Sequence, residues 1–184
     1  MKKFQMRVTF LALSVVGLLV MTGCATAPRT VEGKNVLTSK VQNAINLAKR
    51  EDPGLNKFFN NSAGYAIFPT VGKGAVGIGG AYGKGELYEF GQLSGYCDLT
   101  QVSIGFALGG QGYTELIFFE TKGDVDRFKS GNFAFAAQAS AVAVKSGVSA
   151  NADYENGVAV FTMSETGLMF EASIGGQKFS YQPK

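Results

Sequence analysis

The chain has no histidine among its 184 residues. This absence excludes the Ser-His-Asp and Cys-His nucleophilic systems, the zinc hydrolase motifs and histidine-ligated haem, all of which depend on an imidazole. A Ser-Lys pair would escape the exclusion, but Lys145 and Ser146 are adjacent, and neighbours on a strand point to opposite faces. Any acid–base chemistry would therefore have to depend on carboxylates.

Cysteine is also scarce, with Cys24 and Cys97 as the two examples. Two cysteines, one of them close to the N-terminus, do not supply the disulfide framework of a small secreted domain. Cys97 lies between Tyr96 and Asp98 at what we predict to be the start of a strand. A small buried hydrophobic residue is the expected role of Cys97, in preference to a reactive thiol.

The N-terminus has the anatomy of a secretory leader. Basic residues at positions 2, 3 and 7 precede an almost unbroken apolar run over residues 10–20, which is too short to span a bilayer. The run ends in Met-Thr-Gly-Cys at residues 21–24, which resembles the lipobox of bacterial lipoproteins, although Met21 replaces the usual leucine. The resemblance implies that residues 1–23 are a signal peptide and that Cys24 is acylated. An ordinary secretory leader with a chance cysteine, or an uncleaved anchor, is the alternative.

Location follows from the residue after this cysteine. Ala25 stands where an aspartate would resemble the signal for retention in the inner membrane. We therefore expect a lipid-anchored protein on the periplasmic face of a Gram-negative outer membrane. Residues 24–34 would form a short lipidated tether, and residues 35–184 a single domain of ordinary size.

Removal of the leader changes the charge balance. Three of the 17 basic residues belong to the leader, so the mature chain has 14 basic and 14 acidic side chains. Such a chain offers no globally basic surface for nucleic acid. Residues 25–85 nevertheless hold eight basic and three acidic side chains, whereas residues 86–184 hold six and eleven. An anionic membrane would attract the basic part by about 1 kcal/mol per well-placed Lys or Arg, although each lysine taken alone is equally typical of a solvated surface.

Two helices are expected before any strand. Apolar residues recur with helical spacing through residues 35–50, which predicts an amphipathic helix ended by Asp52 and Pro53. Asp52 also suits the N-cap of a second, short helix with Pro53 at its first position and Phe58 on its buried side. A further helix is expected to begin near residue 121, where Asp124 and Asp126 suit a first turn.

From residue 63 onward the pattern has the period of two that is typical of strands. Large and small residues alternate through residues 76–79, 102–109, 133–136 and 141–144, and again through 168–174. Residues 115–120 are apolar on both faces and predict a central strand. Glycine or asparagine turns near residues 156, 166 and 175 favour antiparallel pairing of the last strands. The predicted fold is α+β, a curved and mainly antiparallel sheet or partial barrel with N-terminal helices packed on it.

A glycine-rich segment over residues 72–80 contains the pattern G-x-G-x-x-G. In dinucleotide-binding proteins a helix must begin directly after these glycines, because its N-terminus holds the pyrophosphate. The glycine-laden sequence that follows here would not sustain a helix. We therefore interpret the glycines as strand and turn residues.

Several of these stretches together resemble the SYLF domain family. The segment Ala-Gly-Tyr-Ala-Ile-Phe-Pro at residues 63–69 looks like its A-x-x-x-I-F-P signature, and the similarity continues through residues 73–80, 82–85 and 103–106 to 167–173. It covers roughly residues 36–182. The family contains lipid-binding modules: eukaryotic members bind phosphoinositides, in part through an N-terminal amphipathic helix, and some bind actin. The resemblance implies a capacity to engage anionic lipid, whereas the phosphoinositide preference and actin binding are not carried over.

The sequence thus predicts a membrane-anchored, non-catalytic lipoprotein that binds anionic phospholipid and needs no cofactor or metal. The proposed lipid contacts are cations of the basic part of the chain, namely Lys40, Lys49, Arg50, Lys57, Lys73 and Lys84. One alternative is a structural or stress-related module of the cell envelope that binds other envelope proteins. A second alternative is a carboxylate-based hydrolase of envelope polysaccharide, for which Asp98, Glu115 and Glu120 are the candidates and two carboxyl groups about 5–9 Å apart would be needed.

Overall fold

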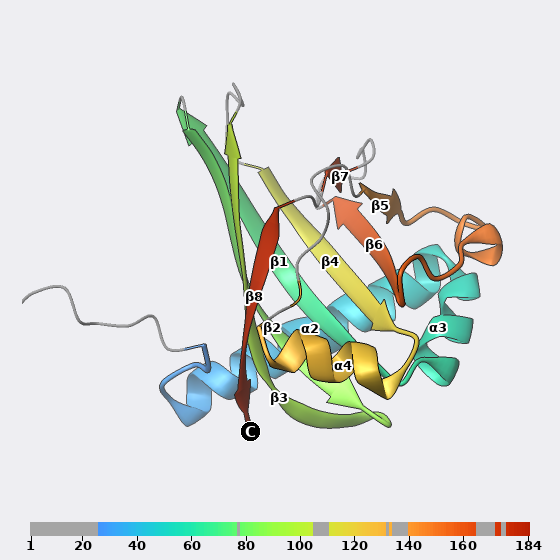
Figure 1. Ribbon diagram of the computed structural model, residues 1–184, viewed down its shortest axis with the longest axis horizontal. Helices are drawn as coiled ribbons and strands as arrows, with labels where there is room; N and C mark the ends of the chain where they lie inside the picture. Colours follow the sequence, from blue (N-terminus) through green and yellow to red (C-terminus); the bar gives the residue numbers. More distant parts are fainter. Residues whose placement is uncertain are drawn as a thin grey trace, which may run out of the picture.

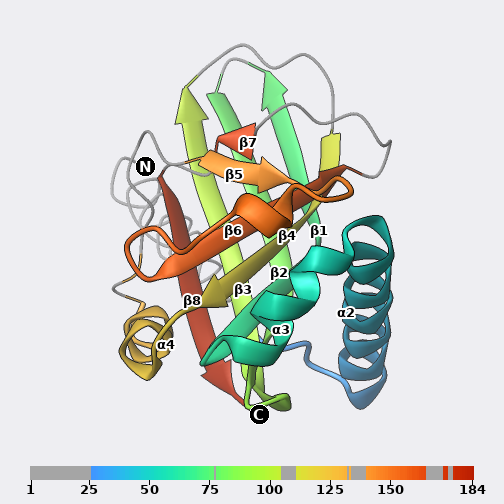
Figure 2. The same cartoon turned by 90° about the vertical axis from the view of Figure 1, so that its right-hand side faces the viewer.

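The computed structural model describes residues 26–76, 78–104, 111–131, 133, 140–164, 172–173 and 176–184. Within these residues, a strongly curved sheet has two helices on one face and one on the other (Figures 1 and 2). This arrangement confirms the predicted α+β class and the N-terminal position of the packing helices. The leader, Cys24 and most of the alternating stretches 133–136 and 168–174 lie outside the described residues.

The first helix, α2 (Val31–Glu51), is the predicted amphipathic helix. It begins four residues earlier than expected, because the Thr30 side chain caps it by accepting a hydrogen bond from the Gly33 amide at 3.0 Å. Its buried side chains are the five that the spacing predicts: Leu37, Val41, Ala44, Ile45 and Ala48. Residues 31–34, expected in the tether, therefore belong to the helix.

Asp52 ends α2 and starts the next element, as the sequence predicts. Its side chain accepts a hydrogen bond from the Gly54 amide at 3.1 Å and so caps the 3-10 helix η1 (Pro53–Leu55), which continues into α3 (Asn56–Asn61). Leu55 and Phe58 are buried against the sheet. The chain thus turns back sharply at the end of α2.

Eight described strands form one sheet in the order β7-β5-β6-β4-β1-β2-β3-β8. Their bounds are β1 (Gly64–Val76), β2 (Ile78–Glu89), β3 (Gln92–Ile104), β4 (Gln111–Phe119), β5 (Ser140–Ala143), β6 (Val158–Ser164), β7 (Ala172–Ser173) and β8 (Gln177–Pro183). The long strands β1 to β4 pair antiparallel, and β4 lies between β1 and β6, as its apolar residues predict. The glycines at positions 72, 74, 79 and 80 lie in β1 and β2, as interpreted.

The alternation of side chains produces two cores, one on each face of the sheet. Leu116 and Phe118 pack under α2 and α3, whereas Ile117 and Phe119 on the same strand point to the concave face. The concave core is closed by α4 (Lys122–Lys129), which contributes Val125 and Phe128. A capping box between Thr121 and Asp124 starts this helix, at the position that its acidic residues predict.

One expectation about pairing is wrong. β5 pairs with β6 in parallel, not antiparallel, because the 14 residues 144–157 between them include the 3-10 helix η2 (Ser149–Asn151) and are long enough for a crossover. The Asn156-Gly157 turn closes only an isolated bridge between Glu155 and Val158. The turn expected near residue 166 lies outside the described residues.

Cys97 lies inside β3, five residues after the strand begins, rather than at its start. The thiol is fully buried among the side chains of the concave core. Burial raises the pKa of Cys97 well above its ordinary value, with the charges of Asp98 and Glu86 acting in the same direction. The predicted role as a small buried hydrophobic residue is confirmed.

Candidate functional site

A bulge interrupts β1 beside α2. The register of β1 against β2 shifts between Ile67 and Thr70, and its register against β4 shifts between Phe68 and Val71. Pro69 lies at the shift, where it lacks the amide proton that a regular ladder would use. Its carbonyl instead accepts a hydrogen bond from Thr114 Oγ1 at 2.8 Å. The Ile-Phe-Pro part of the signature therefore bends the strand where α2 begins.

The residues before α2 form an N-terminal strap over β2, β3 and β8, which we define as residues 26–30. The Ala27 amide donates to Gln182 Oε1 at 3.1 Å, and the Thr26 and Ser180 hydroxyls lie 3.2 Å apart. Lys84 Nζ donates to the Thr26 carbonyl at 3.0 Å. These contacts hold the strap, part of the segment expected to be a tether, against the sheet.

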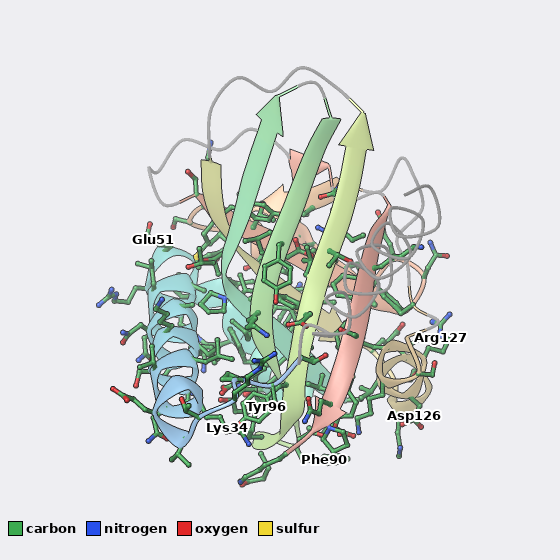
Figure 3. All side chains as sticks on the ribbon, turned by 90° about the vertical axis from the view of Figure 1, so that its left-hand side faces the viewer. Lys34, Glu51, Phe90, Tyr96, Asp126 and Arg127 are labelled. Carbon is green, nitrogen blue, oxygen red and sulfur yellow. The ribbon has the colours of Figure 1, made fainter. Side chains whose placement is uncertain are left out.

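A pocket of about 280 Å³ lies between the strap, the first turns of α2 and the bulge. Apolar atoms of Pro28, Val36, Leu37 and Pro69 line it, and the chains of Lys40 and Lys84 flank it. The remaining lining residues are Gly33 and Thr70. Figure 3 shows α2 beside β1 and β2, with Lys34 on the first turns of the helix. The pocket thus combines an apolar lining with two of the six predicted cations.

The two lysines of the pocket differ in their surroundings. Lys40 is exposed on α2, whereas Lys84 is about one-third exposed and forms an ion pair with Asp98 at 3.3 Å. Burial lowers the pKa of Lys84, but the Tyr82 hydroxyl and the Asp98 carboxylate outweigh it, so that the pKa is raised. Burial in turn raises the pKa of Asp98, against the effect of Lys84. Lys84 is therefore a charged group already engaged by the protein, and Lys40 is the accessible cation.

Among the side chains that the structure describes, the other predicted cations do not line this pocket. Lys49 lies over the Phe59 ring at 4.5 Å and Arg50 is exposed, both in the last turn of α2. Ten residues of helix separate Arg50 from Lys40, about 15 Å along the axis. Lys57 Nζ donates to the carbonyls of Ala150 and Ala152, at 3.1 and 2.8 Å. The side chain of Lys73, on β1, lies outside the described part of the structure.

The three candidate carboxylates of the hydrolase hypothesis are also separated. Asp98 lies on the face of β3 that carries the strap, Glu115 is fully buried on the concave face, and Glu120 is exposed after the end of β4. These three residues therefore supply no pair that converges on one cleft. The hydrolase hypothesis gains no support from them.

A buried polar network that the sequence did not predict lies beneath α2. Glu86 is fully buried and accepts hydrogen bonds from Thr38 Oγ1 at 2.5 Å and from the Tyr88 hydroxyl at 2.7 Å. Gln42 Nε2 donates to the same Tyr88 hydroxyl at 3.0 Å. Burial, together with the neighbouring Glu86, raises the pKa of Tyr88. One signal in the sequence could have indicated this network: Glu86 falls at a position of β2 whose side chain points inward, toward α2.

Two further features bear on the kind of site. The described residues contain no group of three or more Cys, Asp or Glu side chains placed to hold a metal ion. In the same residues, no helix has the length and apolar content needed to cross a membrane.

Comparisons with known proteins identify similar sequences. Residues 100–183 match the profile of the family described as Ysc84, Las17-binding protein actin regulator. The chain is also similar to the Beta cell expansion factor A of Aeromonas veronii, with 25% identity over 162 residues. That match covers 83% of this chain and 59% of the relative, so the chain spans somewhat more than half the length of that protein. Residues 100–183 are therefore similar to the Ysc84/SYLF family, in agreement with the resemblance that the signature at residues 63–69 indicates.

Proposed function

We propose that this chain is a lipid-anchored, non-catalytic envelope protein whose SYLF domain binds anionic phospholipid at the pocket between the strap, α2 and the bulge of β1. The observation that carries the proposal is the position of that pocket. Pro28 of the strap lines it, and only three residues lie between Pro28 and Cys24. An acyl chain on Cys24 would bring the pocket to the bilayer.

The composition of the pocket supports an amphiphilic ligand. Pro28, Val36 and Pro69 offer apolar contact, and Val36 is half exposed. The Lys40 ammonium at the same pocket is a point charge suited to a phosphate oxygen. A volume of about 280 Å³ suits a headgroup or part of an acyl chain rather than a whole phospholipid.

Vesicle binding tests the pocket directly. A chain that begins at Ala25 keeps both cores and every described contact, and lacks the anchor. We expect it to bind phosphatidylglycerol vesicles and to bind phosphatidylcholine vesicles much less. Binding to phosphatidylglycerol should weaken as salt shortens the Debye length below about 8 Å. Lys40→Gln should weaken binding about fivefold, as expected for the loss of about 1 kcal/mol. Lys145→Gln removes an exposed lysine outside the pocket and should have no effect.

The competing outcomes are distinct. Equal losses in the two variants would show a diffuse attraction without a site at the pocket. Binding to none of the vesicles would favour the alternative of an envelope module for protein partners. Separately, mass spectrometry of the native N-terminal peptide should show an acylated Cys24; an unmodified Cys24 or a retained leader would contradict the anchor.

A further inference from the structure

The turn between β2 and β3 presents an aromatic side chain to solvent. Phe90 is 83% exposed, more than any other large hydrophobic residue that the structure describes. Its backbone has a φ of +50°, and Gly91 follows with a φ of +74°. Two successive positive φ angles between the paired residues Glu89 and Gln92 define a two-residue hairpin turn. A bulky residue is rare in this left-handed conformation.

A second turn in the same protein shows the usual solution. Asn156 and Gly157 have φ angles of +54° and +83° and connect the bridged residues Glu155 and Val158. Asparagine is favoured at that position because its short polar side chain tolerates the left-handed region. Phe90 carries both the backbone strain and the exposure of a large apolar surface. The fold gains little packing in return, which points to a contact outside the protein.

The turn lies at the same end of the molecule as the start of α2 and the C-terminus (Figures 1 and 2). Val31, the first residue of α2, is 76% exposed and is second only to Phe90 among the described large hydrophobic residues. Figure 3 shows Phe90, Lys34 and Tyr96 toward this end, with Glu51 farther along α2. The two most exposed apolar side chains therefore belong to one end of the domain.

Lysines lie at this end of the domain, together with the exposed Glu32 in the first turn of α2. Lys34 Nζ lies over the Tyr96 ring at 5.0 Å, and Lys184 follows the last strand and is held by its amide to the Ser94 carbonyl at 3.1 Å. The acidic neighbour of Phe90, Glu89, is paired with Lys129. The lysine and the serine hydroxyl bonded to Glu89 lower its pKa although burial opposes them.

The strap brings the predicted anchor to the same end. The Ala27 amide is bound to Gln182, the last residue but one of β8, which runs toward this end. Two residues lie between Ala27 and Cys24, so the three Cα–Cα steps that join them extend at most about 11 Å. An acyl group on Cys24 therefore cannot reach a bilayer that lies far from this end of the sheet.

We infer that the end of the domain formed by the β2–β3 turn, the start of α2 and the C-terminus lies on the phospholipid bilayer, with Phe90 inserted among the headgroups. Aromatic side chains favour this interfacial region. The inference rests on the proposed function, since it assumes a lipid-anchored protein. It replaces a membrane face built from Lys49, Arg50 and Lys57, because 21 residues of helix place the last turn of α2 about 30 Å from Val31.

The chain contains no tryptophan, so one introduced indole reports on one position. The full-length lipoprotein carrying Phe90→Trp is reconstituted into phosphatidylcholine–phosphatidylglycerol vesicles with or without brominated acyl chains. The matched control is Val148→Trp, because Val148 is partly exposed. The amides of its neighbours Gly147 and Ser149 donate hydrogen bonds to Asp52, so position 148 lies beyond the far end of α2. We expect a blue shift and quenching by brominated lipid at position 90 and neither at position 148.

Flotation separates the possible failures. Protein that does not float with the vesicles overturns both the proposed anchor and this inference. Protein that floats with an unquenched indole at position 90, or with equal quenching at both positions, overturns this inference alone. A blue shift at position 90 without vesicles would show that a second copy of the chain covers the turn and would also overturn it. Phe90→Asn should leave the melting temperature unchanged or higher; a clear fall would show that Phe90 serves the fold.

Discussion

Gln177 Nε2 donates a hydrogen bond to Glu115 Oε2 at 2.9 Å, although β8 and β4 are separated by three strands in the sheet. The bond spans the concave side and shows how far the sheet has curled. Gln177 and Glu115 are both fully buried, and the Tyr113 hydroxyl is 3.3 Å from the same amide nitrogen. Burial and the neighbouring Glu115 raise the pKa of Tyr113.

Gln177→Leu should lower the free energy of unfolding by about 1–3 kcal/mol, because it removes a donor from a buried carboxyl group. Chemical denaturation monitored by circular dichroism measures the loss. Gln92→Leu, at an exposed position at the start of β3, should change stability by no more than about 0.5 kcal/mol. Equal effects of the two substitutions would contradict a role for the bond across the concave face.

Asp52 should make stability depend on pH. Its burial raises the pKa, but hydrogen bonds from the backbone amides of Ser149, Gly54 and Gly147 outweigh burial and lower it. A carboxylate whose pKa is lowered by folding stabilises the protein at a pH above its pKa in the unfolded chain, about 3.9. This stabilisation is lost as the pH falls through the pKa in the folded protein. Asp52→Asn should therefore destabilise the protein at pH 7, and the difference from wild type should shrink below about pH 4.

Thermal unfolding of both proteins between pH 3 and pH 7 measures this difference. The matched control is the neighbouring Glu51→Gln, because Glu51 is exposed at the end of α2. A gap between wild type and Asp52→Asn that stays constant over this range would show that the charge of Asp52 contributes nothing.

Gly157→Ala should be the more damaging of two matched glycine substitutions. Gly157 and Gly147 both have a φ near +80°, so alanine brings a similar backbone strain of about 1–2 kcal/mol at each. A Cβ at position 157 would also lie within 3 Å of the Asp124 carboxylate, whereas position 147 is open. The difference in melting temperature between the two variants therefore measures the effect of the new Cβ on Asp124, whose side chain belongs to the capping box of α4. Indistinguishable variants would contradict it.

Lys57→Gln should loosen the connection between β5 and β6 without affecting vesicle binding. Its ammonium group is bonded to the carbonyls of Ala150 and Ala152, so its loss leaves that loop less tightly held. Faster amide hydrogen exchange through residues 145–157 is the expected result. Lys49→Gln, which removes a cation in the last turn of α2, should leave exchange in that loop unchanged. Weaker vesicle binding by Lys57→Gln would restore Lys57 to the candidate site.

The sequence alone determined the features that depend on neighbouring residues. Helical spacing determined the buried face of α2, and Asp52 with Pro53 determined where it ends, because caps and periodicity act within one or two turns. In the same way, the residues at 115–120 that are apolar on both faces predicted β4 as a central strand. The similarity to the Ysc84/SYLF family was predicted from the signature at residues 63–69 and its continuation.

Tertiary structure decided which predicted residues come together. Lys40 and Lys84 share a pocket because the first turns of α2 pack beside the bulge at Pro69. This contact depends on pairing between strands that are distant in the sequence. The carbonyls that engage Lys57 lie more than 90 residues away along the chain. The parallel pairing of β5 with β6 likewise depends on a crossover anchored by Asp52. Local patterns carry no information on such contacts, since only the packed chain determines which distant groups meet.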